Sequence, residues 1–514
     1  MMITIILQRL QDLYSEAQGA VTWMNVLIYG SIFTATWMVY RLAIYPYMSV
    51  LRKIPGRQRN NIFIGNMGEI LKGEPVDPFV KWITEMKSGF IRYHHLLGYQ
   101  RIVVAEPEAM KHILITHAKN YVKPAFLFRI LMRFTGRGLL CLNGQEHISQ
   151  RKLCMSSFKM AVLKNMVPTM QRHTENLIGL WKRQIEENNK MQLLVNGDLQ
   201  RMTMDILSEC AFGYDTNSLL DPDQPLTKAV HYMIGGMKPK LLRILMPKIY
   251  DALPISENRK FKEYQKMSDE LIKNLIENKK SVINEDTDES KCTDLLSVLL
   301  LARDVETGTG FSQQQLRDHV LTFMLAGHET TSTAICWSLL CLAQRPEVMA
   351  RVRQEVTTVL PPKGETLTFE HLEKMTYLSC FVKEIQRLYP SVPMTFRQAV
   401  NDDVINGHFI PAGTVMNLQM GAMARSPLIW KDPEEFRPER FMNEEEVKPY
   451  TFLPFLAGSR ICIGQKFATM EMKVILALLI HEFTFHPLPD VTYKKQLRLT
   501  MKPEPSLKLT ADII

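Results

Sequence analysis

One ten-residue segment near the C-terminus restricts the possible folds of this chain more than any other. Residues 455–464 read FLAGSRICIG, a glycine-rich loop that precedes an apolar helix expected over residues 467–480. Glycines allow a tight loop whose backbone approaches a bound group and points N–H groups at a sulfur atom. The N-terminus of the following helix favours a Cys462 thiolate, and Arg460 offers a planar donor fork to a carboxylate. The segment therefore predicts a cofactor bound through Cys462, with a buried cysteine in a glycine-rich turn as the alternative.

Composition excludes several classes of protein. The chain has 514 residues, which is enough for three to four domains or one unusually large one. Its 46% hydrophobic and 22% charged residues exclude wholesale disorder, a collagen-like repeat and a polytopic membrane bundle. The eight cysteines show no zinc-binding spacing, so reduced thiols in a cytosolic environment fit best. The net charge of +9 favours a membrane surface or an acidic protein as partner, and no basic block interleaved with aromatics points to nucleic acid.

The N-terminal region has the pattern of a membrane anchor. Residues 17–40 are uncharged and mostly apolar, which is long enough to span a bilayer with some tilt. Positive residues follow this stretch, so the positive-inside rule predicts that the rest of the chain is cytoplasmic. A buried core helix is the alternative. We therefore expect a short lumenal N-terminus (1–16), a single transmembrane anchor (17–40), a basic linker with Pro and Gly (41–60) and one body (61–514).

The body reads as mainly α with small β-sheets. Apolar residues at three- and four-residue steps predict helices over residues 168–189 and 256–280. Ser312 and Gln315 form a capping-box pattern, and no proline follows until Pro346, so one helix of about 33 residues is expected there. The strand signals are few and short: residues 101–105, 404–405, 409–410 and 497–499.

The loop around Cys462 resembles the haem-binding signature of the cytochrome P-450 superfamily. Its fixed positions give the pattern FxxGxRxCxG, carried by Phe455, Gly458, Arg460, Cys462 and Gly464. The resemblance implies the cytochrome P-450 fold, with one large haem catalytic domain after a single transmembrane helix. It implies haem b as cofactor, with Cys462 as the axial thiolate ligand of the iron. A His in place of the usual Trp before Gln-Arg-Lys, here His147 before residues 150–152, makes the sequence similar to fungal members of the family.

Two further motifs precede the loop in the order that the family shows. Glu384-Ile-Gln-Arg387 resembles the ExxR motif, whose spacing puts both side chains on one helix face. Residues 438–441, Pro-Glu-Arg-Phe, resemble the PERF motif, whose arginine is here Arg440. The resemblance implies that Glu384, Arg387 and Arg440 form a buried network that holds the haem-side core. Taken alone, ExxR also fits an exposed helical ion pair worth roughly a few tenths of a kcal/mol.

A third motif lies midway along the long helix expected after Ser312. Residues 326–331, AGHETT, resemble the family signature AGx[D/E]T[T/S]. The resemblance implies that Ala326 lies at the cofactor and that Gly327 lets the helix kink to leave room for dioxygen. It also implies that Glu329 and Thr330 are catalytic, because together they relay protons to dioxygen. A surface Glu beside back-bonding Thr residues is the alternative.

The resemblance also implies which residues contact the haem. Arg151, Arg397 and Arg460 would bind the propionates. His147 stands where the family often has Trp in WxxxR, and it can donate a hydrogen bond only in the right tautomer. Phe455, Gly464 and Ala326 would complete the haem pocket.

The substrate is less constrained. Family position places substrate-facing residues in segments rich in Phe, Met and Leu: 126–140, 230–245, Phe323, Ala326, 392–396 and 499–502. An apolar pocket suits a lipophilic small molecule, such as a steroid, a terpenoid, a fatty acid or a xenobiotic. Three arginines within residues 129–137 either bind an acidic substrate or lie on the outer face.

The resemblance implies a membrane monooxygenase of the endoplasmic reticulum that takes electrons from elsewhere. No flavin or iron–sulfur segment is recognisable after Cys462, so an NADPH–cytochrome P-450 reductase is expected as partner, with cytochrome b5 as a possible second donor. The acidic face of the reductase would contact cations on the Cys-loop side of this protein, including Lys152, Lys466 and Lys473. Two alternatives stay open: a haem-thiolate isomerase or dehydratase that acts on a peroxide without dioxygen, and a non-enzymatic haem carrier or sensor.

Overall fold

The structure is a computed structural model that describes residues 2–187, 192–236, 243, 246–283, 294–304 and 308–514. It confirms the expected class, because helices dominate the described residues. The helices are α1 (Met2–Val39), α2 (Tyr45–Met48), α3 (Met67–Lys72), α4 (Asp77–Met86), α5 (Pro107–Lys111), α6 (Ala125–Thr135), α7 (Gly144–Met155), α8 (Met160–Lys164), α9 (Val167–Glu187), α10 (Val195–Phe212), α11 (Pro225–Gly235), α13 (Pro247–Ala252), α14 (Ser256–Val282), α15 (Leu295–Leu301), α16 (Gln313–Ala343), α17 (Pro346–Val359), α18 (Phe369–Lys374), α19 (Thr376–Leu388), α20 (Met420–Ala424) and α21 (Gln465–Glu482). The strands are β1 (Phe90–His94), β2 (Gln100–Val104), β3 (Tyr121–Val122), β4 (Thr395–Ala399), β5 (Asp403–Ile405), β6 (His408–Ile410), β7 (Val415–Leu418), β8 (Phe483–Pro487), β9 (Lys494–Leu497), β10 (Met501–Glu504) and β11 (Leu509–Ile513).

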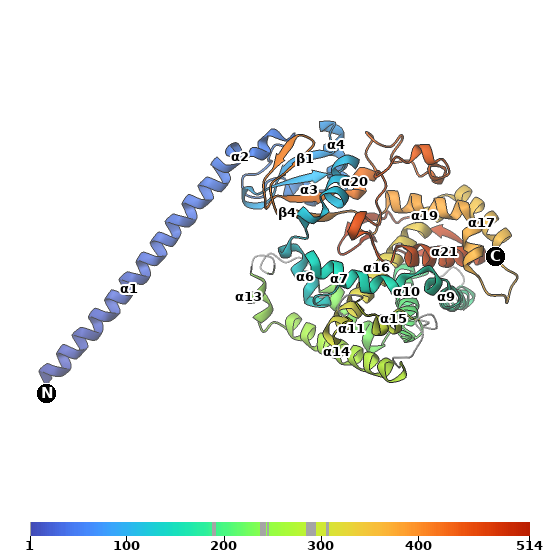
Figure 1. Ribbon diagram of the computed structural model, residues 1–514, viewed down its shortest axis with the longest axis horizontal. Coiled ribbons are helices and arrows are strands. Elements are labelled where there is room, and N and C mark those ends of the chain that lie inside the picture. The colour runs from blue at the N-terminus through green and yellow to red at the C-terminus, as the bar shows by residue number, and fades with distance from the viewer. Residues whose placement is uncertain (1, 188–191, 237–242, 244–245, 284–293, 305–307) are drawn as a thin grey trace.

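The largest sheet joins two distant parts of the chain. Its order is β1-β2-β7-β4-β3, with β2 and β7 parallel and the other pairs antiparallel. The smaller described sheets are the pairs β9–β10, β8–β11 and β5–β6. Figure 1 shows the large sheet at the end of the body nearest α1, while most helices lie on the other side. The molecule therefore has a sheet-rich end next to the N-terminal helix and a helical remainder.

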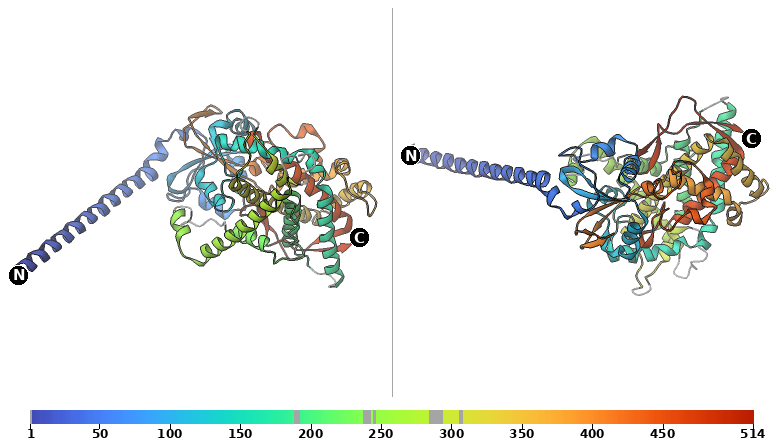
Figure 2. Two further views of the ribbon diagram at one scale, coloured as in Figure 1. Left: turned by 60° about the horizontal axis from the view of Figure 1, so that its bottom comes forward. Right: turned by 90° about the horizontal axis from the view of Figure 1, so that it is seen from above.

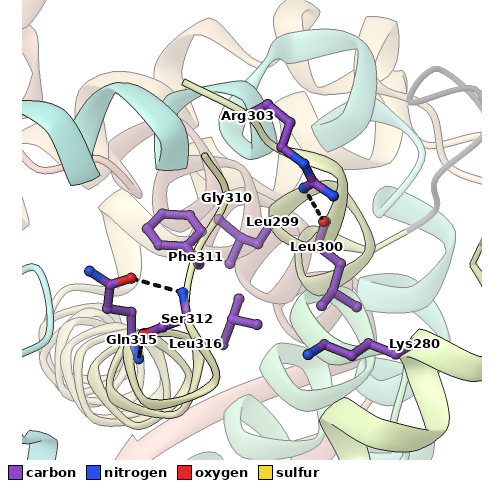
Figure 3. Close-up of a pocket in the computed structure, with 9 residues that line it drawn as sticks. All are labelled: Lys280, Leu299, Leu300, Arg303, Gly310, Phe311, Ser312, Gln315 and Leu316. Carbon is purple, nitrogen blue, oxygen red and sulfur yellow. Dashed lines mark hydrogen bonds between the residues drawn. The ribbon is translucent and has the colours of Figure 1, made fainter. Parts of the chain in front are cut away.

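The long central helix follows the sequence prediction closely. α16 spans 31 residues and begins at a capping box, in which Ser312 Oγ accepts from the Gln315 N–H and Gln315 Oε1 accepts from the Ser312 N–H (Figure 3). It ends three residues before Pro346, which opens α17. α10 packs along it, and α14, α19 and α21 also contact it. α16 is therefore the axis around which the helical part is built.

The N-terminal helix projects away from the body. α1 is continuous from Met2 to Val39, and it stands clear of the rest of the molecule in all views (Figures 1 and 2). The segment Thr22–Met48 is long and apolar enough to cross a membrane. Only 6% of its most apolar 18-residue stretch is buried against the rest of the protein. Large apolar side chains there, such as Trp23 and Phe33, are exposed. Such a surface is costly in water and is expected in lipid. The described helix also includes residues 2–16, which were expected as a separate lumenal segment.

The expected linker, residues 41–60, packs against the body. Leu51 and Ile54 are buried in the hydrophobic core around the large sheet. The Arg92 N–H donates to Pro55 O at 2.8 Å, and Arg57 forms an ion pair with Glu69 at 3.0 Å. These contacts fix the direction in which α1 leaves the body. A boundary at residue 61 therefore cuts through packed structure, which the basic residues and the Pro-Gly pair of this segment did not indicate.

Candidate functional site

The loop before Cys462 is as tight as its glycines predict. Gly458 has φ +67°, and a Cβ there would lie 2.1 Å from Leu114 O, so no other residue fits. The Cys462 N–H donates to Phe455 O at 2.8 Å, which closes the turn. Gly464 has no such steric demand, but it precedes α21 directly and its N–H interacts with the Cys462 sulfur. The loop thus presents the cysteine immediately before a helix N-terminus.

Cys462 differs from the other cysteines in its environment. Of the seven cysteines in the described part of the chain, six are buried and Cys462 is exposed. Burial by surrounding protein raises the pKa of the Cys462 thiol, while the Gly464 N–H and the Arg151 charge oppose this shift. Cys462 is therefore open to a ligand, and the Gly464 N–H and the Arg151 charge favour its anion against a net rise in the pKa of the thiol.

Four cations gather beside this loop. They are Lys123, Arg151, Arg397 and Arg460, and none of them pairs with a carboxylate in the described part of the chain. Burial and the charge of Arg460 lower the pKa of Arg397 to about 10, and burial and Arg151 lower that of Arg460 to about 10. Arg397 is buried, and its Nη2 has no hydrogen-bond partner. Such a cluster calls for an anion to balance it.

The remaining contacts of these cations are to backbone and amide oxygens. Arg460 donates to Leu142 O at 2.9 Å and to Asn143 Oδ1 at 3.4 Å, and Arg397 donates to Phe396 O at 2.8 Å. Lys123 donates to Leu140 O, and burial together with Arg460 and Arg397 lowers its pKa well below the usual value. Sequence reasoning missed Lys123, because a single lysine after a two-residue strand carries no local signal of such a role.

His147 lies within the same group. It is buried on α7, and burial with the surrounding cations lowers its pKa to about 3. The ring is therefore neutral at pH 7, with one N–H to donate. It is not the solvated surface histidine that a polar helix would allow.

Most of α16 is buried, but one face of the helix is exposed at the AGHETT motif, residues 326–331. Ala326 is exposed and Thr330 is partly exposed, whereas Leu325 and Glu329 are buried. The Thr330 hydroxyl donates to Ala326 O at 2.7 Å. The helix is continuous through Gly327, and a Cβ at that position would lie 2.7 Å from Leu207 of α10. Gly327 therefore allows close helix packing, a role that its position in the motif does not reveal.

The Glu329 carboxylate is held on another side of α16. It forms an ion pair with Lys502 at 2.6 Å and accepts from Gln200 at 3.0 Å and from Thr500 at 3.2 Å. Burial would raise the pKa of Glu329, but the Lys502 charge and these donors lower it below its usual value. Glu329 and Thr330 are both described, and no hydrogen bond joins them. The acid is thus an ionised, buried partner of Lys502 and not a surface residue.

The predicted ExxR network is present and fully buried. Arg387 donates to both Glu384 oxygens, at 2.7 and 2.8 Å, and both side chains are 0% exposed. Arg440 Nε lies 3.5 Å from Glu384 Oε1, and the Arg437 N–H donates to the same oxygen at 2.8 Å. Arg387 also donates to the carbonyls of Ala424, Pro433 and Glu435. The network joins α19 to the segment that leads to the Cys loop.

A hollow near the start of α16 is separate from this site. It is lined by apolar residues and two cations of α14, α15 and the following loop, including Leu299, Phe311, Lys280 and Arg303 (Figure 3). Gln315, at its edge, precedes Ala326 by eleven residues, about 16 Å along the helix. The hollow therefore does not belong to the candidate site.

One buried acid next to α16 has a testable pH effect. Glu471 on α21 is 1% exposed, and burial raises its pKa to about 8, with the Thr331 hydroxyl opposing only part of the shift. The folded state therefore holds a proton that the unfolded chain loses near pH 4.3. Its contribution to stability is complete below that pH and is lost as the pH rises through about 8.

We expect Glu471→Gln to remove this pH dependence. Between pH 5 and 8 the wild type should lose up to about 1.4 kcal/mol of stability per pH unit relative to the variant. Thermal unfolding of both proteins over this range measures the effect, with the exposed acid Glu270→Gln as control. Parallel stability profiles for wild type and Glu471→Gln would contradict the buried, protonated acid.

Comparison with known proteins identifies the family. Residues 55–511 match the family model described as Cytochrome P450. This chain is a cytochrome P450. It is 29% identical over 493 residues to the cytochrome P450 monooxygenase sphH of Aspergillus fumigatus, covering 91% of this chain and 89% of that protein. It is 31% identical over 441 residues to cytochrome P450 4B1 of Rattus norvegicus, covering 84% of each. It is also 31% identical over 398 residues to taurochenodeoxycholic 6 alpha-hydroxylase of Sus scrofa, covering 76% of this chain and 77% of that protein.

Family membership makes this protein a haem-thiolate monooxygenase, an oxidoreductase that binds haem b. The observed residues fit that cofactor. The exposed Cys462 offers a sulfur ligand, the four cations without a carboxylate partner among the described residues suit two carboxylates, and Ala326 lies on an exposed face of α16. The N-terminal helix is long and apolar enough to be a membrane anchor.

Proposed function

We propose that this cytochrome P450 hydroxylates a lipophilic small molecule with dioxygen and electrons from NADPH, delivered by a separate reductase. The observation that carries the proposal is the cluster of Lys123, Arg151, Arg397 and Arg460, which has no carboxylate partner and lies beside the one exposed cysteine among those described. A peripheral surface site would not need four buried or half-buried basic side chains at one place.

The proposed roles follow from this arrangement. Cys462 is the axial ligand, and Gly464 and Arg151 stabilise its thiolate. Arg151, Arg397 and Arg460 bind the propionates, and His147 adds a neutral N–H. Phe455 and Ala326 would contact the haem. Bound haem supplies the activation of dioxygen, and the protein residues position it, exclude water and deliver protons.

Glu329 and Thr330 are the proposed proton donors. Glu329 is ionised in its ion pair with Lys502. To act as a donor, it must therefore first take up a proton from its hydrogen-bonded neighbours and then pass it to the open face of α16. Thr330 already presents its hydroxyl on that face, and its proton is held by Ala326 O. Rotation of either side chain about one or two bonds would connect the buried network to the site of dioxygen reduction.

We expect Glu329→Gln and Thr330→Ala to lower product formation by about 100-fold, because each removes one proton-transfer group. NADPH consumption should fall less, so the ratio of product to NADPH should drop. The measurement is product and NADPH per haem in variants whose substrate-induced spectral change is retained. Product formation at the wild-type ratio in both variants would show that protons arrive by another route.

The proposed substrate is a lipophilic small molecule of the steroid, terpenoid, fatty acid or xenobiotic class. The name of the Sus scrofa relative, taurochenodeoxycholic 6 alpha-hydroxylase, supports a steroid among these. Arg129 and Arg133 of α6, and Arg137 just after it, do not support a dedicated site for an acidic group. Arg133 pairs with Asp251 at 3.4 Å and stacks on Phe261, and Arg137 pairs with Glu146. Arg129 is exposed. Of the predicted pocket segments, 237–242 and 244–245 lie outside the described residues.

We place the protein in the endoplasmic reticulum membrane, with the catalytic domain cytoplasmic and the Cys-loop side available to an NADPH–cytochrome P450 reductase or cytochrome b5. The exposed lysines Lys152 and Lys466 support docking of an acidic face. Lys473 does not belong to this surface, contrary to the sequence-based expectation. It is buried and donates to Leu372 O, because α21 is apolar on most sides.

The proposed reaction is tested by its cofactor requirements. The full-length protein in membranes, with a reductase, should form product only when NADPH and dioxygen are both present. Product from a hydroperoxide in the absence of both would instead support an isomerase or dehydratase. A haem that binds no lipophilic compound, with a closed six-coordinate iron, would support a carrier or sensor. A spectral binding screen followed by product analysis identifies the substrate.

A further inference from the structure

Two histidines and an aspartate meet on the surface next to the Cys loop, outside the residues used above. His112 Nε2 lies 2.9 Å from Asp403 Oδ2, and His117 Nδ1 lies 3.2 Å from the same oxygen. The three candidate ligand atoms all lie within 4.8 Å of one another. Asp403 lies at the start of β5, almost 300 residues further along the chain, so the fold and not the local sequence creates this cluster.

An unusual turn brings the two histidines together. Residues His112–Thr116 form a π-helical turn, in which the His117 N–H donates to His112 O at 2.8 Å. This five-residue step brings the two imidazoles together, with ring centroids 4.0 Å apart and ring planes tilted by 40°. Single π-turns are rare in proteins and are frequent at functional sites. In an α-helix, residues five apart would point about 140° apart around the axis and would not share a ligand.

The distances suit a metal ion with nitrogen and oxygen ligands. Zinc bonds of about 2.0–2.2 Å in a tetrahedron place neighbouring ligand atoms about 3.3–3.6 Å apart. The observed separations of 2.9 and 3.2 Å to Asp403 Oδ2 differ from this by a few tenths of an ångström. Among the described residues, no lysine or arginine forms an ion pair with Asp403, so no protein cation takes the place of the metal.

The carboxylate is oriented by its own hydrogen bonds. The Tyr121 hydroxyl donates to Asp403 Oδ2 at 2.9 Å, and the Val404 N–H donates to Oδ1 at 2.7 Å. Second contacts of this kind hold metal ligands in place. His117 is half-exposed, which leaves a coordination position open to water.

We propose that His112, His117 and Asp403 form a binding site for a divalent transition metal with a preference for nitrogen and oxygen ligands, of which Zn²⁺ is the best match. The site would fasten the π-turn to β5. Leu114, inside that turn, contacts Gly458 at the start of the Cys-loop turn. Bound metal would therefore stabilise the segment that supports the Cys loop, without taking part in its chemistry.

A second cluster of possible metal ligands is already occupied by a protein cation. His173, Glu209 and Asp215 also bring ligand atoms within 4.8 Å. There, however, Arg172 forms ion pairs with both Glu209 and Asp215, so a cation already occupies the position between the acids. We expect no metal at this second cluster, which makes it a matched internal control.

The test is zinc binding by tag-free, full-length holoenzyme in detergent. Equilibrium dialysis against ZnCl₂, with zinc and iron measured in the same samples, should give one zinc per haem iron. His112→Ala and His117→Ala should each lose this zinc. Tyr121→Phe should weaken zinc affinity by about tenfold, because it removes one outer hydrogen bond. Asp215→Asn should leave the stoichiometry and affinity unchanged.

The result is interpretable even if one variant is unstable. His117 is half-exposed, so His117→Ala should keep the haem spectrum of the wild type and alone suffices for the comparison. Zinc should also raise the unfolding temperature of the wild type and not of this variant. Absence of zinc from the wild type, or equal zinc in the wild type and His117→Ala, would overturn the proposal.

Discussion

Glu384→Ala should prevent accumulation of haem-loaded protein. The Glu384 carboxylate accepts two hydrogen bonds from Arg387, lies 3.5 Å from Arg440 and also accepts the Arg437 N–H, with no exposure to solvent. Its removal leaves Arg387 as a buried charge without an anion, and leaves Arg440 only the 3.9 Å ion pair with Glu435. Breaking a buried pair from one side costs about 3–5 kcal/mol, which is a large part of the 5–15 kcal/mol that stabilises a typical domain.

The measurement is haem per polypeptide and the unfolding temperature of the purified protein. The matched control is Glu270→Ala, which removes an exposed i,i+4 pair with Lys266 at 3.8 Å. That change should cost only about 0.3–0.5 kcal/mol. If Glu384→Ala retained full haem content and unfolded within about 2 °C of the control, the network would not hold the core as we describe.

The sequence predicted the helical frame well because its signals are local. A capping box at Ser312 and the proline at 346 set both ends of α16, and apolar periodicity placed α9 and α14 within a few residues. The strand signals at residues 101–105, 404–405 and 409–410 coincide with β2, β5 and β6, but residues 498–499 lie between β9 and β10, and the partners of the strands were not predicted. β2 pairs with β7, more than 300 residues later, and no local pattern encodes such a pairing.

The candidate site divides in the same way. The Cys loop, the ExxR pair and the AGHETT motif could be found from spacing alone. Lys123, Lys502 and Glu471 could not, because the importance of each depends on a partner brought by the fold: a group of arginines, Glu329 and the buried side of α16. Lys473 was misplaced for the same reason. Its charge suggested an exposed side chain, but it is buried because α21 is apolar on most sides.

Cys462→Ala should abolish monooxygenase activity completely. Among the cysteines that the structure describes, it alone is exposed, and the buried thiols of α7, α10, α16 and α19 cannot replace it without rebuilding the core. The cations beside the loop remain in the variant, so some haem should still bind through its propionates. Activity should fall to the level of protein without haem even in preparations that retain haem.

The most direct test of the account is the spectrum of the reduced carbon monoxide complex. We expect full-length wild type to give the thiolate-type spectrum, and Cys462→Ala to lose it while Cys154→Ala, at a buried cysteine of α7, retains it. Loss confined to Cys462→Ala would establish this sulfur as the ligand of the haem iron. A thiolate-type spectrum that survives in Cys462→Ala would contradict the assignment on which the proposed site rests.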